Sequence, residues 1–267
     1  CLRLVGSEMC IRDSLNNMKN KIILITGATS GIGRATAIRF ANVGARLILC
    51  GRRKEKLDVL VKDLGENHQS LIFDVRDKKA VFKAIESLPN EFKKIDVLIN
   101  NAGNAHGMDS AQTANLDDWD AMIDSNVKGL MYVTKAVLPF MVEKQKGQII
   151  NLGSIAAKEV YPYGSVYCSS KAAVDSFTKG LRVDLNPLGI RVGAIHPGLV
   201  ETEFSYIRFK GDQKRSKKVY EGMNALNADD IADAILYMTQ VPEKVNIADI
   251  VILPTSQANA YVNNRSV

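Results

Sequence analysis

Residues 21–33 have the sequence KIILITGATSGIG, and this stretch sets the expectation for the rest of the chain. An apolar, β-branched run passes directly into a turn that holds Gly27, Gly31 and Gly33, and a helical pattern follows. A glycine-rich turn between a first strand and a helix lets backbone N–H groups and the positive helix end approach a phosphate. The spacing is G-x-x-x-G-x-G rather than the common G-x-G-x-x-G, and glycine turns also occur for purely conformational reasons.

Beyond this stretch, short β-branched runs alternate with longer helical patterns. The alternation predicts an α/β fold with a doubly wound parallel sheet and helices on both faces. The strands are continuous apolar runs, as expected when both faces of a sheet are covered. The seven strand candidates are residues 21–26, 46–50, 70–74, 95–100, 147–152, 190–195 and 249–254.

No linker, repeat or low-complexity tract divides the chain, so residues 18–267 are expected to form a single domain. Residues 199–226 interrupt the alternation between the sixth and seventh strands, and long insertions of this kind are often lids or binding loops. Residues 1–17 show no signal-peptide pattern, and a natural start appears at Met18. We interpret residues 1–17 as a non-native or disordered leader outside the fold.

Composition and charge limit the kinds of partner that are expected for this protein. The chain has 267 residues, 46% of them apolar, and no apolar run approaches the roughly 18 residues of a membrane span. Its formal charge of +6 is scattered and no aromatic-basic surface is evident, so neither a membrane nor a nucleic-acid partner is expected. Four cysteines without CxxC spacing fit a reducing cytoplasm, and three histidines without a ligand-like motif predict no metal. A small-molecule substrate is expected.

The end of the second strand indicates the cofactor. In NAD-binding units of this kind, an acidic residue near this point binds the ribose hydroxyls. Here the strand continues into Gly51, Arg52 and Arg53, with no carboxylate. Two guanidinium groups suit a 2′-phosphate, because arginine offers planar, permanently charged donors. NADP is therefore the expected cofactor; the alternative is that both arginines begin a solvated helix.

Residues 164–174, GSVYCSSKAAV, place Tyr167 and Lys171 four positions apart. On a helix, residues i and i+4 lie on the same face, so the phenol and the ammonium would meet. A nearby cation favours the phenolate and is expected to lower the tyrosine pKa, as proton-transfer catalysis requires. The alternative is a structural pair, with a surface lysine beside a half-buried tyrosine.

Seven motifs together resemble the short-chain dehydrogenase/reductase family, in family order over almost the whole chain from Met18. The resemblance implies a Rossmann-type sheet of about seven parallel strands, assembled as a homotetramer. The motifs are Thr26-Gly27-x-x-x-Gly31-Ile32-Gly33, Asp74-Val75, Asn100-Asn101-Ala102-Gly103, Asn126, Ser154, Tyr167-x-x-x-Lys171 and Pro197-Gly198.

The resemblance also implies catalytic roles. Tyr167 resembles the general acid/base, and Lys171 the residue that lowers its pKa and bonds the nicotinamide ribose. Ser154 resembles the donor that polarises the substrate carbonyl, and Asn126 the fourth member, linked to Lys171 through water.

Cofactor contacts are implied in the same way: a phosphate turn at the glycines, an adenine contact at Asp74, a structural support at Asn101, and a carboxamide contact at Thr202. The expected cofactor-binding set is Gly27, Thr29, Ser30, Gly31, Ile32, Gly33, Arg52, Arg53, Asp74, Val75, Asn101, Ala102, Gly103, Tyr167, Lys171, Pro197, Gly198, Val200 and Thr202.

Three segments, RFKGD after ETEFS, VLPFMVE and PTSQANAY, resemble the NADP-dependent 3-hydroxy acid dehydrogenases of the serine and allo-threonine type. This resemblance implies hydride transfer between NADP and the 3-hydroxyl or 3-oxo group of small 3-hydroxy acids, including serine, allo-threonine, 3-hydroxypropionate and malonic semialdehyde. The alternatives are a general NADPH-dependent carbonyl or 3-ketoacyl reductase and, from another class, a non-catalytic NADP-sensing regulator. An intact catalytic set argues against the regulator.

A small hydroxy acid also needs a cation, because removing a carboxylate from water is costly unless a positive charge meets it. Arg208, in the 199–226 insertion, is the expected contact, since arginine binds carboxylates bidentately. Lys210 is the second choice. The alternative is that Arg208 is paired with an acid or a neighbouring subunit.

Overall fold

Seven strands form one parallel sheet, and each of them coincides with a strand expected from the sequence. The computed structural model describes residues 18–265, so the interpretation of residues 1–17 as a leader lies outside the described residues. The sheet order is β3-β2-β1-β4-β5-β6-β7, with every neighbouring pair parallel. The strands are β1 (Ile22–Thr26), β2 (Arg46–Gly51), β3 (Gln69–Ile72), β4 (Val97–Asn100), β5 (Gly147–Leu152), β6 (Ile190–Pro197) and β7 (Asp249–Ile252).

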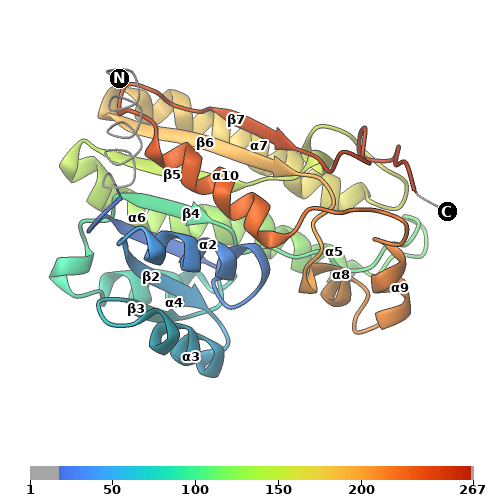
Figure 1. Cartoon of the computed structure of the whole chain (residues 1–267), viewed down its shortest axis with the longest axis horizontal. Helices are drawn as coiled ribbons and strands as arrows, with labels where there is room; N and C mark the ends of the chain where they lie inside the picture. The colour runs from blue at the N-terminus through green and yellow to red at the C-terminus, as the bar shows by residue number, and fades with distance from the viewer. Residues whose placement is uncertain (1–17, 266–267) are drawn as a thin grey trace, which may run out of the picture.

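Helices cover both faces of the sheet (Figure 1). Successive residues of a strand point to opposite faces, and β1 therefore contributes to two apolar cores. Ile23 and Ile25 pack with one set of helices, whereas Ile22 and Leu24 pack with the other. The first set is α2 (Gly31–Asn42), α3 (Lys54–Leu64) and α10 (Ala228–Gln240); the second is α4 (Lys78–Glu86), α6 (Leu130–Lys144) and α7 (Ser165–Leu185).

The remaining helical segments lie in the connections. α5 (Leu116–Ile123) runs through a π-helical segment, η2 (Asp124–Gly129), directly into α6. The 199–226 insertion carries two short helices, α8 (Glu203–Arg208) and α9 (Gln213–Lys218), which Figure 1 shows beyond the C-terminal ends of the strands. The short 3-10 turns are η1 (Asn90–Phe92), η3 (Ile155–Ala157) and η4 (Asn186–Leu188).

The strand order reverses between β1 and β4. The chain continues from β1 toward β2 and β3 on one side, and from β4 toward β7 on the other. In open parallel sheets, ligands bind outside the carboxyl ends of the strands at such a reversal. The glycine turn after β1 lies at this point. Within the described residues, no helix is long and apolar enough to cross a membrane.

Candidate active site

A cavity of about 730 Å³ opens at the C-terminal ends of the strands. It extends from the arginines after β2 to the tyrosine and lysine of α7, and the insertion helix α8 contributes to its wall. All of the site residues expected from the sequence line it except Gly33 and Asn126. The sequence motifs, which lie far apart in the chain, therefore converge on one cavity.

The glycine turn after β1 packs closely against the loop that follows β4. Gly27 has a φ of +67° and Gly31 a φ of +50°, a region that favours glycine. A Cβ atom at Gly33 would lie 2.3 Å from the Gly27 carbonyl oxygen and 2.4 Å from Nδ2 of Asn101. That same Nδ2 donates a hydrogen bond of 2.8 Å to the Thr26 carbonyl. Asn101 thus supports the turn, and the start of α2 remains free of side chains.

The two arginines after β2 have different surroundings. Arg53 donates hydrogen bonds of 2.8 Å to the hydroxyls of Thr29 and Ser30, both in the glycine turn. It also lies 3.4 Å from a carboxylate oxygen of Glu203 in α8. Arg52 is 64% exposed and pairs with Asp74 at 3.3 Å. Arg53 is therefore the guanidinium that is fixed beside the turn, and it precedes α3 rather than lying on a solvated helix face.

Asp74 follows β3 and lies between two arginines. Arg76, which the sequence motifs did not single out, donates at 2.7 Å to the same Asp74 oxygen that Arg52 contacts. Burial raises the pKa of Asp74, but the hydrogen bonds from Arg76 and the charges of Arg52 and Arg76 outweigh burial and lower it to about 2. This end of the cavity therefore combines three arginines with two carboxylates, those of Asp74 and Glu203.

Tyr167 and Lys171 lie one turn apart on α7 and are both buried. The Lys171 Nζ atom is 6.0 Å from the centroid of the Tyr167 ring and donates a 2.8 Å hydrogen bond to the Leu152 carbonyl at the end of β5. Burial lowers the pKa of Lys171 to about 8. Ser154, two residues after β5, accepts a 3.1 Å hydrogen bond from the N–H of Ala156.

The predicted direction of the Tyr167 pKa shift is wrong for the chain by itself. Burial raises this pKa well above its ordinary value, and a neighbouring phenol, Tyr161, acts in the same direction. The hydrogen bond with Ser154 and the charge of Arg208 lower it, but by less. The four-residue spacing correctly placed a lysine near the phenol, yet it carried no information about the desolvation of the ring.

Asn126 lies in the π-helical segment and is 1% exposed. Its side-chain amide exchanges two 2.8 Å hydrogen bonds with the backbone of Asn104 and donates a third, of 3.0 Å, to the hydroxyl of Ser170. A Cβ atom on Gly103 would lie 3.0 Å from its Oδ1 and 3.7 Å from the Lys171 Nζ atom. Gly103 therefore separates Asn126 from Lys171 without filling the space between them.

Arg208, at the end of α8, reaches the same part of the cavity as Tyr167. Its Nε donates to the Gly107 carbonyl at 3.1 Å, and its Nη1 donates to the Tyr161 hydroxyl at 3.0 Å. Its guanidinium carbon lies 5.5 Å from the centroids of both the Tyr161 and the Tyr167 rings. No carboxylate among residues 18–265 forms an ion pair with Arg208, whereas Lys210 pairs with Asp118 at 2.9 Å.

The loop between β6 and α8 forms the remaining wall. A Cβ atom on Gly31 would lie 3.4 Å from Cβ of Thr202, so this loop contacts the glycine turn. The Thr202 hydroxyl caps α8 by accepting a 3.2 Å hydrogen bond from the Phe204 N–H. The Phe204 ring meets the Tyr167 ring edge-on, with centroids 5.8 Å apart. Pro197, Gly198 and Val200 line the cavity between these contacts.

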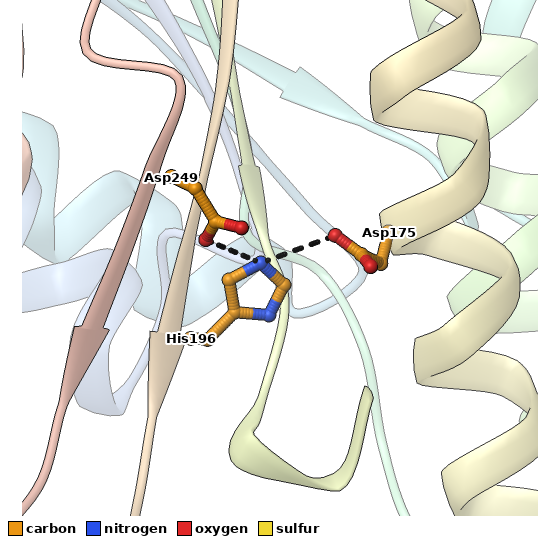
Figure 2. A group of neighbouring side chains, drawn as sticks. All are labelled: Asp175, His196 and Asp249. Atoms are coloured by element: carbon orange, nitrogen blue, oxygen red, sulfur yellow. Dashed lines mark ion pairs between the residues drawn. The ribbon is translucent and has the colours of Figure 1, made fainter. Parts of the chain in front are cut away.

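A cluster of charged residues beneath Ser154 was missed by the sequence analysis. Figure 2 shows His196 of β6 between Asp175 of α7 and Asp249 of β7. The ammonium group of Lys158 lies 3.0 Å from Asp175 and 2.7 Å from Asp249. This ammonium contacts both carboxylates, and the expected absence of a metal stays a prediction. No local motif links these four residues, so only the fold could reveal the cluster.

The chain belongs to the short-chain dehydrogenase family, whose sequence pattern matches residues 21–212. The family resemblance inferred from the motifs is confirmed, and so is the oxidoreductase class. The α/β architecture with seven parallel strands is confirmed as well, because it matches solved structures of this family.

Characterised relatives cover nearly the whole chain. An NADP-dependent 3-hydroxy acid dehydrogenase of Salmonella typhi is 46% identical over 240 residues, which are 90% of this chain and 97% of that protein. Sulfoacetaldehyde reductase 2 of Chromohalobacter salexigens is 47% identical over 240 residues, or 89% of this chain and 95% of that protein. The closed form of a serine dehydrogenase complexed with NADP+ is 44% identical, covers 92% of this chain and 100% of its own, and superimposes with a TM-score of 0.88.

Proposed function

We propose that this protein is an NADP-dependent dehydrogenase of small 3-hydroxy acids. One observation carries the proposal: a single cavity holds Arg53 beside the phosphate turn at one end and Arg208 beside Tyr167 at the other. The first arginine suits the extra phosphate of NADP, and the second suits a small anionic substrate. The Salmonella typhi relative is named as an NADP-dependent 3-hydroxy acid dehydrogenase, and the similar solved structure is a serine dehydrogenase with NADP+. Both names support the proposed cofactor and the proposed substrate class.

The residues at the phosphate end fit NADP. Gly33 lets the start of α2 pack against Gly27 and Asn101, and backbone N–H groups at a helix start favour a pyrophosphate. Arg53 is held beside the turn by Thr29 and Ser30, and a 2′-phosphate bound there would share its guanidinium with Glu203, which lies 3.4 Å away. Val75, Ala102 and Gly103 line the cavity between this end and Lys171. When bound, NADP supplies or accepts the hydride.

The protein's own contribution is proton transfer and charge stabilisation. We assign Tyr167 as the acid that protonates the carbonyl oxygen during reduction and as the base that removes the hydroxyl proton during oxidation. We assign Ser154, whose hydroxyl acts to lower the pKa of Tyr167, as the donor to the same oxygen. Lys171, charged at neutral pH because its pKa is about 8, stabilises the phenolate. Asn126 and Gly103 define the space through which water would reach Lys171.

The substrate carboxylate is assigned to Arg208. A 3-hydroxy acid carries its charge two carbons from the reacting carbon, and the guanidinium carbon of Arg208 lies 5.5 Å from the centroid of the Tyr167 ring, so both groups face the same part of the cavity. Arg208 is held by Gly107 and Tyr161, both uncharged, so its positive charge is not neutralised by a described carboxylate. A buried carboxylate requires such a cation. Lys210 is already paired with Asp118 and is assigned no part in the site.

A sulfonate substrate is the second candidate. The relative from Chromohalobacter salexigens is named for reduction of sulfoacetaldehyde. In that molecule one carbon separates the sulfonate group from the reacting carbon, just as one carbon separates the carboxylate group from the reacting carbon of a 3-hydroxy acid. Arg208 would bind a sulfonate with the same donors. A 3-ketoacyl reductase and an NADP-sensing regulator are less well supported, because the cation is inside the cavity and the catalytic set is complete.

The test is a substrate panel followed at the nicotinamide absorbance. L-serine, L-allo-threonine, 3-hydroxypropionate, malonic semialdehyde and sulfoacetaldehyde are compared with NADP(H) and NAD(H). We expect the highest kcat/KM for a 3-hydroxy acid or its 3-oxo product with NADP(H). Higher kcat/KM for sulfoacetaldehyde would select the second candidate, and preference for uncharged carbonyls would refute both.

We also propose that the enzyme works in the cytoplasm as a homotetramer. Cys50 and Cys168 are buried free thiols, which fits a reducing compartment. The tetramer rests on the family resemblance alone. Sedimentation equilibrium of the purified protein gives its mass directly, and a monomer or dimer would contradict this part of the proposal.

A further inference from the structure

His196 contacts the backbone of Ser154 and is fully buried. It is the penultimate residue of β6 described above, and its Nδ1 atom lies 3.3 Å from the Ser154 nitrogen and 3.2 Å from the Ser154 oxygen. A Cβ atom on Gly153 would lie 2.3 Å from this Nδ1. The ring therefore packs directly against Gly153 and Ser154, the two residues that follow β5.

The other ring nitrogen faces carboxylates. Nε2 of His196 is 3.1 Å from Asp249 and 3.5 Å from Asp175 (Figure 2), although neither contact has the alignment of a full hydrogen bond. An unprotonated nitrogen would direct its lone pair at these negative oxygens, so the proton of a neutral ring belongs on Nε2. Nδ1 then has a free lone pair, and the Ser154 N–H is the donor that it meets.

Burial favours the neutral form of the ring. Burial lowers the pKa of His196 below its ordinary value, while Asp249 raises it and Lys158 lowers it. The charges around the ring are balanced without a charged imidazole, because Lys158 contacts both carboxylates and Lys179 contacts Asp175 at 2.8 Å.

We propose that His196 is a positioning residue for Ser154: Asp249 and Asp175 fix the Nε2–H tautomer, and Nδ1 then holds the Ser154 N–H. This assignment rests on the proposed function, in which the Ser154 hydroxyl donates to the reacting oxygen. When Nε2–H faces the two carboxylates, the other ring nitrogen, Nδ1, is the acceptor, and the buried ring holds it in place so that it limits the movement of the Ser154 backbone.

The same cluster connects the elements that carry the catalytic groups. Lys158 follows η3, one turn after Ser154, while Asp175 lies on α7 one turn after Lys171. Lys158 and His196 both contact Asp175 and Asp249, so the Ser154 turn, α7, β6 and β7 are joined beneath the cavity. The position of Ser154 relative to α7, which carries Tyr167, therefore depends on contacts that involve neither catalytic hydroxyl.

Nuclear magnetic resonance of the unliganded full-length protein tests the tautomer without any assay of activity. Long-range 15N–1H spectra distinguish a protonated from an unprotonated ring nitrogen. We expect His196 at pH 7.5 to show a protonated Nε2 and an unprotonated Nδ1. A protonated Nδ1 would overturn the proposal, because that nitrogen could not accept the Ser154 N–H.

Two amide variants separate positioning from simple support. In His196→Asn the side-chain oxygen can occupy the place of Nδ1 and accept from Ser154, whereas in His196→Gln the amide reaches only the place of Nε2. We expect kcat within about threefold of wild type for His196→Asn and at least about tenfold lower for His196→Gln, a loss equal to about 1.4 kcal/mol. The KM for NADP should change less than about twofold in both.

Lys146→Gln is the control, because Lys146 is an exposed lysine just before β5 that pairs with Glu243 and forms no ion pair with Asp175, His196 or Asp249. It should leave kcat unchanged. Equal losses of kcat in His196→Asn and His196→Gln would overturn the proposal. A His196→Gln protein with a lower melting temperature but a normal kcat would also overturn it. The amide shift of Ser154, which should move in His196→Gln and not in His196→Asn, keeps this test independent of the substrate. A wild-type enzyme inactive on the whole substrate panel would refute only the proposed function.

Discussion

The guanidinium carbon of Arg208 lies 5.5 Å from the centroid of the Tyr167 ring, although the two residues are on different helices. The Lys171 Nζ atom is 6.0 Å from the same centroid, so the phenol has two cations near it. One comes from the catalytic helix α7, and the other comes from the insertion helix α8. This relationship joins the proposed acid/base residue to the proposed substrate contact.

Removing the phenol hydroxyl should abolish most of the turnover. Tyr167→Phe keeps the ring, its edge contact with Phe204 and the apolar packing, but it removes the transferable proton. We expect kcat to fall by about 10²- to 10⁴-fold, the usual effect of losing a general acid or base. Binding of NADP, measured by titration calorimetry, should change little. Near-normal kcat would show that another group transfers the proton.

The arginines after β2 should differ in their effect on cofactor choice. Arg53 is fixed by the glycine turn, whereas Arg52 pairs with Asp74 and is mostly exposed. We expect Arg53→Ala to weaken NADP binding by about 10- to 100-fold, as loss of charge-assisted hydrogen bonds would do, and Arg52→Ala by less than about threefold. The dissociation constant for NAD serves as the control. A larger effect at Arg52, or equal weakening of NAD, would contradict the assignment of Arg53.

The buried charge on Lys171 should cost stability. Its pKa falls to about 8 in the folded protein, from 10.5 in an unfolded chain. Between these values the unfolded state binds the extra proton, so the wild type should gain stability relative to Lys171→Met as pH rises. The gain is at most about 1.4 kcal/mol per pH unit, and it is absent below pH 8.

Urea unfolding of both proteins at pH 7, 8, 9 and 9.5 measures this difference. A free-energy difference that stays constant over the whole range would mean that Lys171 has an ordinary pKa in the folded protein. A decrease would mean that the charged form is stabilised by the fold.

Much of the architecture could be predicted from the sequence, for a local reason. A strand such as 190–195 is apolar throughout, because both faces of a parallel sheet are covered, and its pattern needs no knowledge of distant residues. The glycine turn is local too, since Gly27 and Gly31 adopt positive φ values and Gly33 must lack a side chain.

Other features depended on contacts that no local pattern encodes. The pKa of Tyr167 is raised because the fold buries its ring, whereas the sequence showed only the lysine one turn away. Arg76 competes for Asp74, and Tyr161 holds Arg208, through pairings set by the ends of different strands and helices. His196 and Asp249 are 53 positions apart and meet only because β6 and β7 are neighbours.

The most direct test of the account compares an acid with its ester in an Arg208 variant. The kcat/KM values are measured for a 3-hydroxy acid and for its uncharged methyl ester with NADP, using wild type, Arg208→Ala and, as a matched control, Lys210→Ala. We expect Arg208→Ala to lose about 1–3 kcal/mol on the acid, roughly 5- to 150-fold, with little change on the ester and little effect of Lys210→Ala on either. An equal loss on the acid and the ester would contradict the account, because Arg208 would then support the fold of α8 without binding the substrate carboxylate.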